Sequence, residues 1–296
     1  MRADVSGPVL RFAPSPNGRL HLGHAYSALM NERIAAALAG RLFLRIENLD
    51  QVRSKREFEA GVRDDLQWLG IRFDGSPRSQ SEHIEDYAHA LDRLDGMGLV
   101  YPCFCSRSEV ATQAAGRDPD GAPLYGGVCR VLSREERASR FARGDKVAYR
   151  LDMKAALGRL IERLSWIEFG DDATPTEQAA APELWGDFVL KGRDLAASYH
   201  LAVTVDDGLQ GVTDVVRGRD LFAATSVHRL LQALLDLPAP RYRHHRLVLD
   251  ATGAKLSKRR SSPALSALRE QGITPEEIRT SLGFGAGESR LSVTFS

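Results

Sequence analysis

Short apolar strand patterns alternate with amphipathic helix patterns through the first hundred residues, and this alternation limits the possible folds more than any other feature. The strand pattern Val9–Phe12 runs into a breaker-rich segment at 13–18, and a second buried strand is predicted over Leu42–Ile46. Apolar residues that repeat on one face predict helices from Tyr26 to Leu38, Phe58 to Leu69 and Ile84 to Leu94, the first two ending at Gly40 and Gly70. Strands and helices in this order form βαβ units with parallel strands. The sequence therefore predicts an α/β protein with a Rossmann-like parallel sheet.

The chain changes character between residues 101 and 185, which predicts that the sheet is split by an insertion. This segment holds the cysteines, a polar stretch and an alternating, strand-like run from Lys146 to Met153. Apolar strand patterns return at Tyr199–Val205 and Val212–Val216, with Asp206-Asp207-Gly208 as the turn between them. We expect residues 1–100 and 186–240 to form the two halves of the Rossmann-like domain, 101–185 the insertion, and 241–296 a lysine-motif loop with a short C-terminal helical segment.

Charge and composition place few limits on partners. The 40 basic and 39 acidic residues give a net charge of +1, so any RNA contact should be local, for example through the basic stretch 241–246. No secretory signal and no apolar run long enough to span a bilayer are present in the sequence. Three cysteines, two of them in Cys103-Phe-Cys105, fit a reducing compartment better than a disulfide framework. We expect a cytoplasmic monomer without a membrane segment.

The segment from Arg11 to His24, Arg-Phe-Ala-Pro-Ser-Pro-Asn-Gly-Arg-Leu-His-Leu-Gly-His, carries the first chemical motif. It lies where a predicted strand passes into a predicted helix, the position at which open α/β sheets bind ligands. Free N–H groups at a helix N-terminus attract anions. His21 and His24 can donate hydrogen bonds to phosphate, and Gly23 lets a ligand approach the backbone. The alternative is that both histidines only cap the helix.

The second motif, Lys255-Leu-Ser-Lys258-Arg259, follows a glycine and a basic stretch. Two lysines in such a loop suit a clamp on a triphosphate, because negative charge develops as pyrophosphate leaves. Taken alone, the same pentapeptide could equally be a solvated basic loop.

Taken together and in order, these motifs resemble class I aminoacyl-tRNA synthetases. Two further segments narrow the resemblance to the glutamyl branch: Leu44-Arg-Ile-Glu47-Asn-Leu-Asp50, and Val205-Asp-Asp followed by Gly211-Val-Thr-Asp-Val-Val-Arg217-Gly-Arg-Asp220. The resemblance runs from about residue 9 to residue 265. Only a short segment follows the lysine motif, so the chain resembles the truncated branch without an anticodon-binding domain, the glutamyl-queuosine tRNA(Asp) synthetases.

That resemblance implies a ligase that activates L-glutamate with ATP and magnesium and transfers it to the queuosine base in the anticodon loop of tRNA(Asp). It implies catalytic roles for His21, His24, Lys255 and Lys258, and ATP binding by His21, Gly23, His24 and Lys258. It implies a glutamate site formed by Arg11, Ser15, Glu47, Tyr199 and Arg217. Without the family, Arg11 could be a surface cation on an edge strand and Tyr199 a core aromatic residue. His200 and the pair His244-His245 are expected to be solvated or to face RNA.

The cysteine cluster predicts one structural zinc ion. Cys103, Cys105, Tyr125 and Cys129 match the zinc pattern of the truncated branch, and zinc binds thiolates with four tetrahedral ligands. The phenol of Tyr125 is a weaker donor than the thiolates, because it must lose a proton to bind, so water or a histidine could replace it. Three buried cysteines without a metal are the alternative.

Two other functions remain open at the level of the sequence. The chain could be a glutamyl-tRNA synthetase core that acts with a separate tRNA-binding domain. It could also be a non-catalytic, synthetase-derived RNA-binding protein, although the intact histidine and lysine motifs argue against this.

Overall fold

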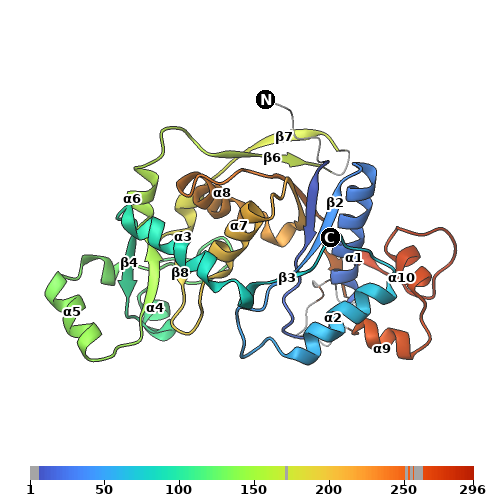
Figure 1. The fold of residues 1–296 in the computed structure, drawn as a ribbon, viewed down its shortest axis with the longest axis horizontal. Coiled ribbons are helices and arrows are strands. Elements are labelled where there is room, and N and C mark those ends of the chain that lie inside the picture. The colour runs from blue at the N-terminus through green and yellow to red at the C-terminus, as the bar shows by residue number, and fades with distance from the viewer. Residues whose placement is uncertain (1–6, 171–172, 251–252, 254–255, 257–262) are drawn as a thin grey trace.

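A computed structural model describes residues 7–170, 173–250, 253, 256 and 263–296 of the chain (Figure 1). Its strands are β1 (Val9–Phe12), β2 (Arg41–Ile46), β3 (Arg78–Ser79), β4 (Val100–Cys103), β5 (Ala148–Leu151), β6 (Ser165–Phe169), β7 (Pro175–Ala179), β8 (Val189–Lys191), β9 (Asp214–Gly218), β10 (Arg241–His245), β11 (Val248–Leu249) and β12 (Thr294–Phe295). Its α-helices are α1 (Leu22–Ala37), α2 (Arg56–Trp68), α3 (Ile84–Gly96), α4 (Arg107–Gln113), α5 (Arg134–Ala142), α6 (Met153–Leu157), α7 (Tyr199–Leu209), α8 (Thr225–Leu234), α9 (Leu265–Glu270) and α10 (Pro275–Ser281). Short 3₁₀ turns are η1 (Gln80–Glu82), η2 (Val128–Val131), η3 (Pro182–Trp185) and η4 (Arg219–Leu221).

The central strands are parallel, which confirms the predicted α/β class. Strands β1, β2 and β3 pair in parallel, and so do β9, β10 and β6, while β7 folds back antiparallel on β6. The two groups meet at β1 and β9, where the amide of Thr213 donates to the carbonyl of Val9 at 2.9 Å. Strands that are distant in sequence therefore form one continuous surface, and their carboxyl ends lie together.

The middle of the chain forms a separate antiparallel sheet of β4, β5 and β8, away from the parallel strands (Figure 1). The alternating run predicted from Lys146 to Met153 contains β5. Strand β8, at Val189–Lys191, belongs to this sheet although it lies beyond residue 185. The division of the chain into the four segments proposed from the sequence stays a prediction.

The predicted strand Tyr199–Val205 and the turn after it are wrong. Residues Tyr199–Leu209 form helix α7, and Asp206 and Asp207 lie inside that helix. Every residue from Leu201 to Asp207 is buried, so the apolar run has no polar face that would reveal a helical period.

Helix α1 ends at Ala37, just before the predicted Gly40, but the left-handed conformation after it belongs to another residue. Ala39 adopts that conformation, with φ of 49°, whereas Gly70 has the expected positive φ of 77° after α2. A Cβ at Gly40 would lie 2.5 Å from the carbonyl oxygen of Pro8. Gly40 is therefore required by the close approach of the chain before β1 to the chain before β2.

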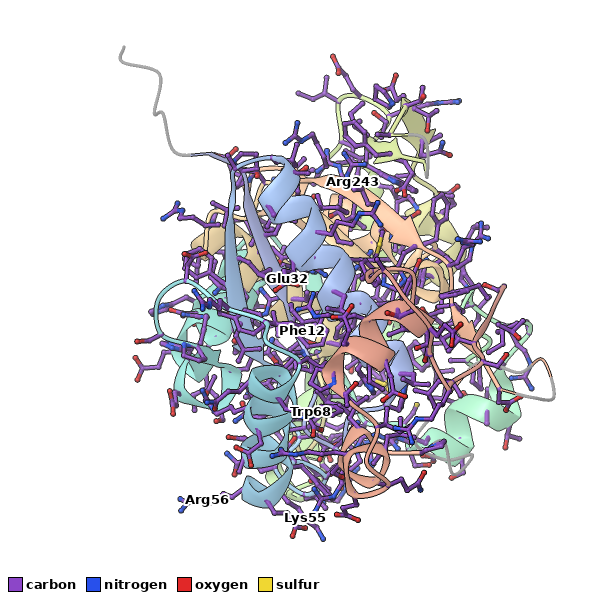
Figure 2. All side chains as sticks on the ribbon, turned by 90° about the vertical axis from the view of Figure 1, so that its right-hand side faces the viewer. Phe12, Glu32, Lys55, Arg56, Trp68 and Arg243 are labelled. Atoms are coloured by element: carbon purple, nitrogen blue, oxygen red, sulfur yellow. The ribbon has the colours of Figure 1, made fainter. Side chains whose placement is uncertain are left out.

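The C-terminal helices α9 and α10 pack on the same hydrophobic core as β1, β2, α1 and α2. Trp68 at the end of α2 lies beside α9, and the guanidinium carbon of Arg269 is 5.8 Å from the centre of its ring (Figure 2). Arg279 of α10 forms an ion pair with Glu32 of α1 at 3.0 Å. In the described part of the chain, no helix combines the length and the apolar composition needed to cross a membrane.

Candidate active site

A cavity of about 610 Å³ opens at the carboxyl ends of β1, β9 and β10, beside the N-terminus of α1. This is where parallel α/β sheets bind ligands. Its lining includes every described residue that the sequence predicted for the glutamate and ATP sites: Arg11, Ser15, His21, Gly23, His24, Glu47, Tyr199 and Arg217. The structure thus brings together residues from four separate segments of the chain, and their individual roles stay predictions.

His21 and His24 both cap helix α1. The alternative interpretation, that these histidines are helix caps, therefore describes part of their contacts. The Nδ1 atom of His21 accepts from the amide of Gly23 at 3.1 Å, and the Nδ1 atom of His24 accepts from the amide of His21 at 3.2 Å. In the neutral rings the proton must then be on Nε2. Capping consequently fixes both imidazoles with a donor nitrogen at the helix N-terminus, where an anion is favoured.

The His21 ring packs so closely on Gly23 that this position has little room for a side chain. A Cβ at this position would lie 3.0 Å from Cε1 and 3.1 Å from Nδ1 of His21. A larger residue would therefore displace the His21 ring from its capping position.

Arg11 is buried in the cavity wall and is neutralised by Asp207 of α7. Its Nε donates to Asp207 Oδ1 at 2.9 Å, and the same oxygen accepts from Nη1 of Arg45 at 2.7 Å. Arg45, which has no exposed surface, also lies 3.3 Å from Glu47 through Nη2. Arg11 is thus not the surface cation of the alternative interpretation.

Glu47 lies at the cavity side of this charged group. Burial raises the pKa of its carboxyl group, and the nearby Arg45 and Arg11 oppose that effect. A further cation in the cavity would favour the ionised form of Glu47.

Arg217, at the end of β9, is a buried cation whose described partners are all neutral. Its Nε donates to His244 Nε2 at 3.1 Å and its Nη1 to His228 Nδ1 at 3.1 Å, while its Nη2 donates to the Thr225 hydroxyl at 2.7 Å and the Leu221 carbonyl at 3.2 Å. Among the described residues no carboxylate forms an ion pair with Arg217. Arg11 and Arg217 therefore differ in whether the protein itself supplies the opposite charge.

The expectation that His200, His244 and His245 are solvated or face RNA is wrong for the side chains of His244 and His245, whereas His200 is half-buried. The side chain of His244 is only 2% exposed, and His245 is buried beside the ring of Tyr26. His200 Nδ1 lies 3.2 Å from His228 Nε2. Burial lowers the pKa of His200 and of His244 to about 4, so both rings are neutral at physiological pH.

Tyr199 is the first residue of α7 and lines the cavity with 38% of its surface exposed. Desolvation raises the pKa of its hydroxyl group to about 12, which keeps it a neutral donor. Tyr199 is consequently not an enclosed core residue.

The predicted lysines Lys255 and Lys258 lie outside the described residues. Leu256, between them in sequence, lines the cavity, and its amide donates to the carbonyl of Val248 at 3.0 Å. This segment therefore reaches the cavity at Leu256.

The three cysteines form one cluster, and their Sγ atoms lie within 4.8 Å of one another. The Sγ atoms of Cys105 and Cys129 are 3.5 Å apart, and the Tyr125 hydroxyl is 3.7 Å from Cys105 Sγ. Sulfurs bound to one tetrahedral zinc ion would be about 3.8 Å apart, so these donors fit that ion. The Arg150 guanidinium carbon lies 4.0 Å from the centre of the Tyr125 ring. Burial and the hydrogen bonds to the cysteines nevertheless raise the pKa of the Tyr125 hydroxyl group, so only the charge of a bound metal ion would favour the phenolate.

The sequence reasoning missed Arg45, Asp207 and His228. Asp207 was visible in the sequence but was assigned to a turn, and Arg45 was treated as part of a buried strand. His228 lies in the predicted second half of the sheet, and no local pattern marks it, because its partners come from α7 and β9.

Comparisons with known proteins agree with this geometry. Residues 9–288 match the model of the family "tRNA synthetases class I (E and Q), catalytic domain". A relative from Rhodobacter capsulatus, called Glutamyl-Q tRNA(Asp) synthetase, is 43% identical over 93% of this chain and 99% of its own length. A Glutamate--tRNA ligase 2 from Nitrosococcus oceani is 37% identical over 90% of this chain, but this chain spans only 57% of that protein.

Among solved structures, a glutamate tRNA ligase from Elizabethkingia meningosepticum superposes with a TM-score of 0.74 at 24% identity. The match covers 93% of this chain and 60% of that ligase, and at this identity it shows the fold alone. The family model and the relatives above 30% identity cover almost the whole chain, so they show the family as well as the fold. The chain belongs to the class I tRNA synthetases of the glutamate and glutamine group, and it is an ATP-dependent ligase.

Proposed function

We propose that this ligase activates L-glutamate with ATP and transfers the glutamyl group to the queuosine base in the anticodon loop of tRNA(Asp). Ligation of glutamate to tRNA follows from the family and from the names of its relatives. The choice of queuosine is supported by the R. capsulatus relative. The chain is 43% identical to that relative and matches 99% of its length, whereas it is 37% identical to the N. oceani glutamate–tRNA ligase and matches 57% of its length.

The observation that carries the glutamate assignment is the neutral surrounding of Arg217. A guanidinium has five N–H donors, and four of them are taken by His244, His228, Thr225 and Leu221. With respect to the described residues, one N–H of Nη1 and the positive charge of Arg217 are left for a ligand. A side-chain carboxylate supplies the missing charge, whereas the amide of glutamine cannot.

The other end of glutamate fits the opposite side of the cavity. The carboxylate of Glu47 would bind the ammonium group, whose positive charge would oppose the effect of burial on the pKa of Glu47. Tyr199 and Ser15 line the cavity and would add hydroxyl contacts. Arg11 is already neutralised by Asp207, so we assign it to orienting the amino acid through hydrogen bonds.

Activation would join glutamate to AMP. An oxygen of the α-carboxylate attacks the α-phosphorus of ATP, and the bond to the bridging oxygen breaks, so that pyrophosphate leaves with the electron pair. The Nε2–H groups of His21 and His24 would stabilise the charge that develops on phosphate oxygens. Lys255 and Lys258 are assigned to the triphosphate from the motif alone, and magnesium would arrive with ATP.

Transfer would then release AMP. A hydroxyl oxygen of the queuosine cyclopentene ring attacks the glutamyl carbonyl carbon. AMP leaves with the electrons of the broken C–O bond, and the hydroxyl proton passes to a phosphate oxygen of the departing AMP or to water. Arg241 and Arg246, the exposed residues of the basic stretch 241–246, could contact the RNA backbone. Zinc at Cys103, Cys105, Tyr125 and Cys129 would hold the β4–β5 region together.

The first experiment is glutamate-dependent exchange of pyrophosphate into ATP by the purified protein, with and without total tRNA. We expect exchange with glutamate alone, followed by labelling of queuosine-containing tRNA(Asp). Exchange only with tRNA(Glu) would favour a glutamyl-tRNA synthetase core that uses a separate tRNA-binding domain. The absence of exchange under both conditions would leave the non-catalytic RNA-binding protein.

A matched pair of variants tests the role of Arg217 in the same assay. Arg217→Met should raise the KM for glutamate by roughly 100-fold, because a charge-assisted hydrogen bond in a buried site is lost. Arg219→Met changes an exposed arginine two residues away and should leave the KM unchanged. Equal effects of the two substitutions would contradict the assignment.

A further inference from the structure

A carboxylate and three histidines form a chain of hydrogen bonds that starts at Arg217 and lies outside the cavity lining. Glu168 of β6 accepts from His244 twice: its Oε1 from the backbone amide at 2.8 Å, and its Oε2 from Nδ1 at 2.8 Å. The indole Nε1 of Trp166 donates to the same Oε2 at 3.1 Å. Glu168 and His244 are therefore locked together, and Glu168 is not part of the cavity lining.

The direction of each hydrogen bond in this group is fixed by Arg217. An arginine side chain cannot accept, so Nε2 of His244 must accept from Arg217 Nε, and the His244 proton is on Nδ1, facing Glu168. On the other side, Nδ1 of His228 must accept from Arg217 Nη1. The His228 proton is then on Nε2, which donates to His200 Nδ1 at 3.2 Å.

Charges agree with this order. Burial lowers the pKa of His244 to about 4, so the ring accepts from Arg217 as a neutral group. Although burial opposes ionisation of Glu168, the hydrogen bonds from His244 lower the pKa of its carboxyl group. The negative charge is thus held one residue away from Arg217, where it orients the guanidinium without neutralising it.

We propose that Glu168 is a positioning residue that, through His244, fixes the guanidinium of Arg217 and so sets the selectivity for a carboxylate over an amide. The proposal rests on the assignment of Arg217 to the glutamate side chain. A direct Glu168–Arg217 ion pair would remove the need for a carboxylate ligand. A freely rotating Arg217 could adapt to the amide of glutamine.

The substitution Glu168→Gln tests the proposal with little change in size. If the new amide NH₂ faces the His244 ring, His244 must move its proton to Nε2. Two donors then meet at Arg217 Nε, and Arg217 is displaced. If the NH₂ faces the His244 backbone amide instead, the lock between the two residues is lost. Either arrangement loosens Arg217.

We expect Glu168→Gln to raise the KM for glutamate about 10- to 100-fold, the range for loss of a hydrogen bond to a charged group. The KM for ATP should stay unchanged, and the ratio of kcat/KM for glutamate over glutamine should fall. Glu177→Gln, the same change on the paired strand β7, is the control, since Glu177 is exposed and accepts only from the Ser165 hydroxyl in the described contacts. An unchanged KM for glutamate, or an equal rise in the KM for ATP, would overturn the proposal.

Nitrogen-15 NMR of labelled histidines gives a readout that does not depend on activity. The wild-type protein should show the Nδ1–H form for His244 and the Nε2–H form for His228, and Glu168→Gln should change the His244 signals. Unaltered His244 signals in the variant would contradict the proposal that Glu168 acts on Arg217 through His244. A failure of the proposed function would be seen in a different experiment, because the wild-type protein itself would then lack glutamate-dependent pyrophosphate exchange.

Discussion

Two arginines in the cavity, Arg11 and Arg217, show how the surroundings of one side chain decide its use. Asp207 binds Arg11 directly, whereas Arg217 is surrounded by neutral imidazoles and hydroxyl or carbonyl oxygens. A buried cation without a counter-charge is costly, so a ligand carboxylate that removes this cost gains affinity. The same cost explains why the surrounding histidines must stay neutral.

The neutral state of His244 predicts a loss of stability at mildly acidic pH. Its pKa is about 4 in the folded protein and about 6.5 in an unfolded chain. Between these values the unfolded chain binds a proton that the folded protein does not. The free energy of unfolding therefore falls as pH drops from 6.5 to 4, by about 3 kcal/mol at most for this residue.

Urea unfolding between pH 7.5 and 4.5 measures this dependence. His244→Gln should reduce the slope of the curve in that window, and the slope that remains is due to other buried histidines such as His200, whose pKa is also about 4. His89→Gln, at an exposed position on α3, should leave the slope unchanged. A wild-type free energy of unfolding that stays constant from pH 6.5 to 4.5 would contradict the prediction.

At the scale of elements, the stability of the β4–β5–β8 sheet depends on the small cluster of buried side chains packed beside β4. Cys103 ends β4, and Cys129 lies in the η2 turn, whose contacts to β4 are made within a small cluster of buried side chains. A cluster of this size buries little apolar surface, so a bound metal ion would contribute much of its stability.

We expect the purified protein to hold about one zinc ion per chain, in the proportion set by one four-ligand site. Cys129→Ser should remove the metal and lower the Tm, and Tyr125→Phe should weaken binding if the phenol is the fourth ligand. Zinc content by atomic emission is the measurement, and Ser133→Ala, at the N-cap of α5, serves as the control. Full zinc content in Tyr125→Phe would assign the fourth position to water or a histidine, and zinc-free wild-type protein would reject the site.

Across the whole molecule, one buried group of charges joins the two parts of the chain that flank the middle segment. Asp206 of α7 accepts from Arg78 at 2.7 Å, from Gln80 at 2.8 Å and from the Tyr87 hydroxyl at 3.0 Å. Asp207, the next residue, binds Arg11 and Arg45. The partners precede the aspartates by more than a hundred residues, so the contacts form only when both halves of the sheet are assembled.

Asp206→Asn should therefore lower the free energy of unfolding by about 3–5 kcal/mol, the usual cost of leaving a buried charge without its partner. Asp194→Asn breaks an ion pair with Lys146 in which the Asp194 side chain is 73% exposed, and it should cost less than about 1 kcal/mol. Urea unfolding at neutral pH compares the two. Similar losses in both variants would show that the buried group does not couple the halves.

The sequence by itself determined the features that depend on near neighbours. Strand β1, the glycine after α2 and the capping histidines of α1 follow from residues within a few positions of one another, because local turns and helix ends need no distant partner. The sequence motifs also indicated the family, which the family model confirms. The first motif lies at a strand end, where parallel sheets bind ligands.

The tertiary structure decided what depends on distant partners. Helix α7 was mistaken for a strand because it is buried on all sides and so lacks an amphipathic period. The neutral partners of Arg217 come from η4, α8 and β10, and no pattern along the chain records which groups will surround a buried charge. Local sequence placed Arg11, Arg217 and the histidines of α1 on their elements. Packing alone decided which of the cations are neutralised, because electrostatic interactions act through space.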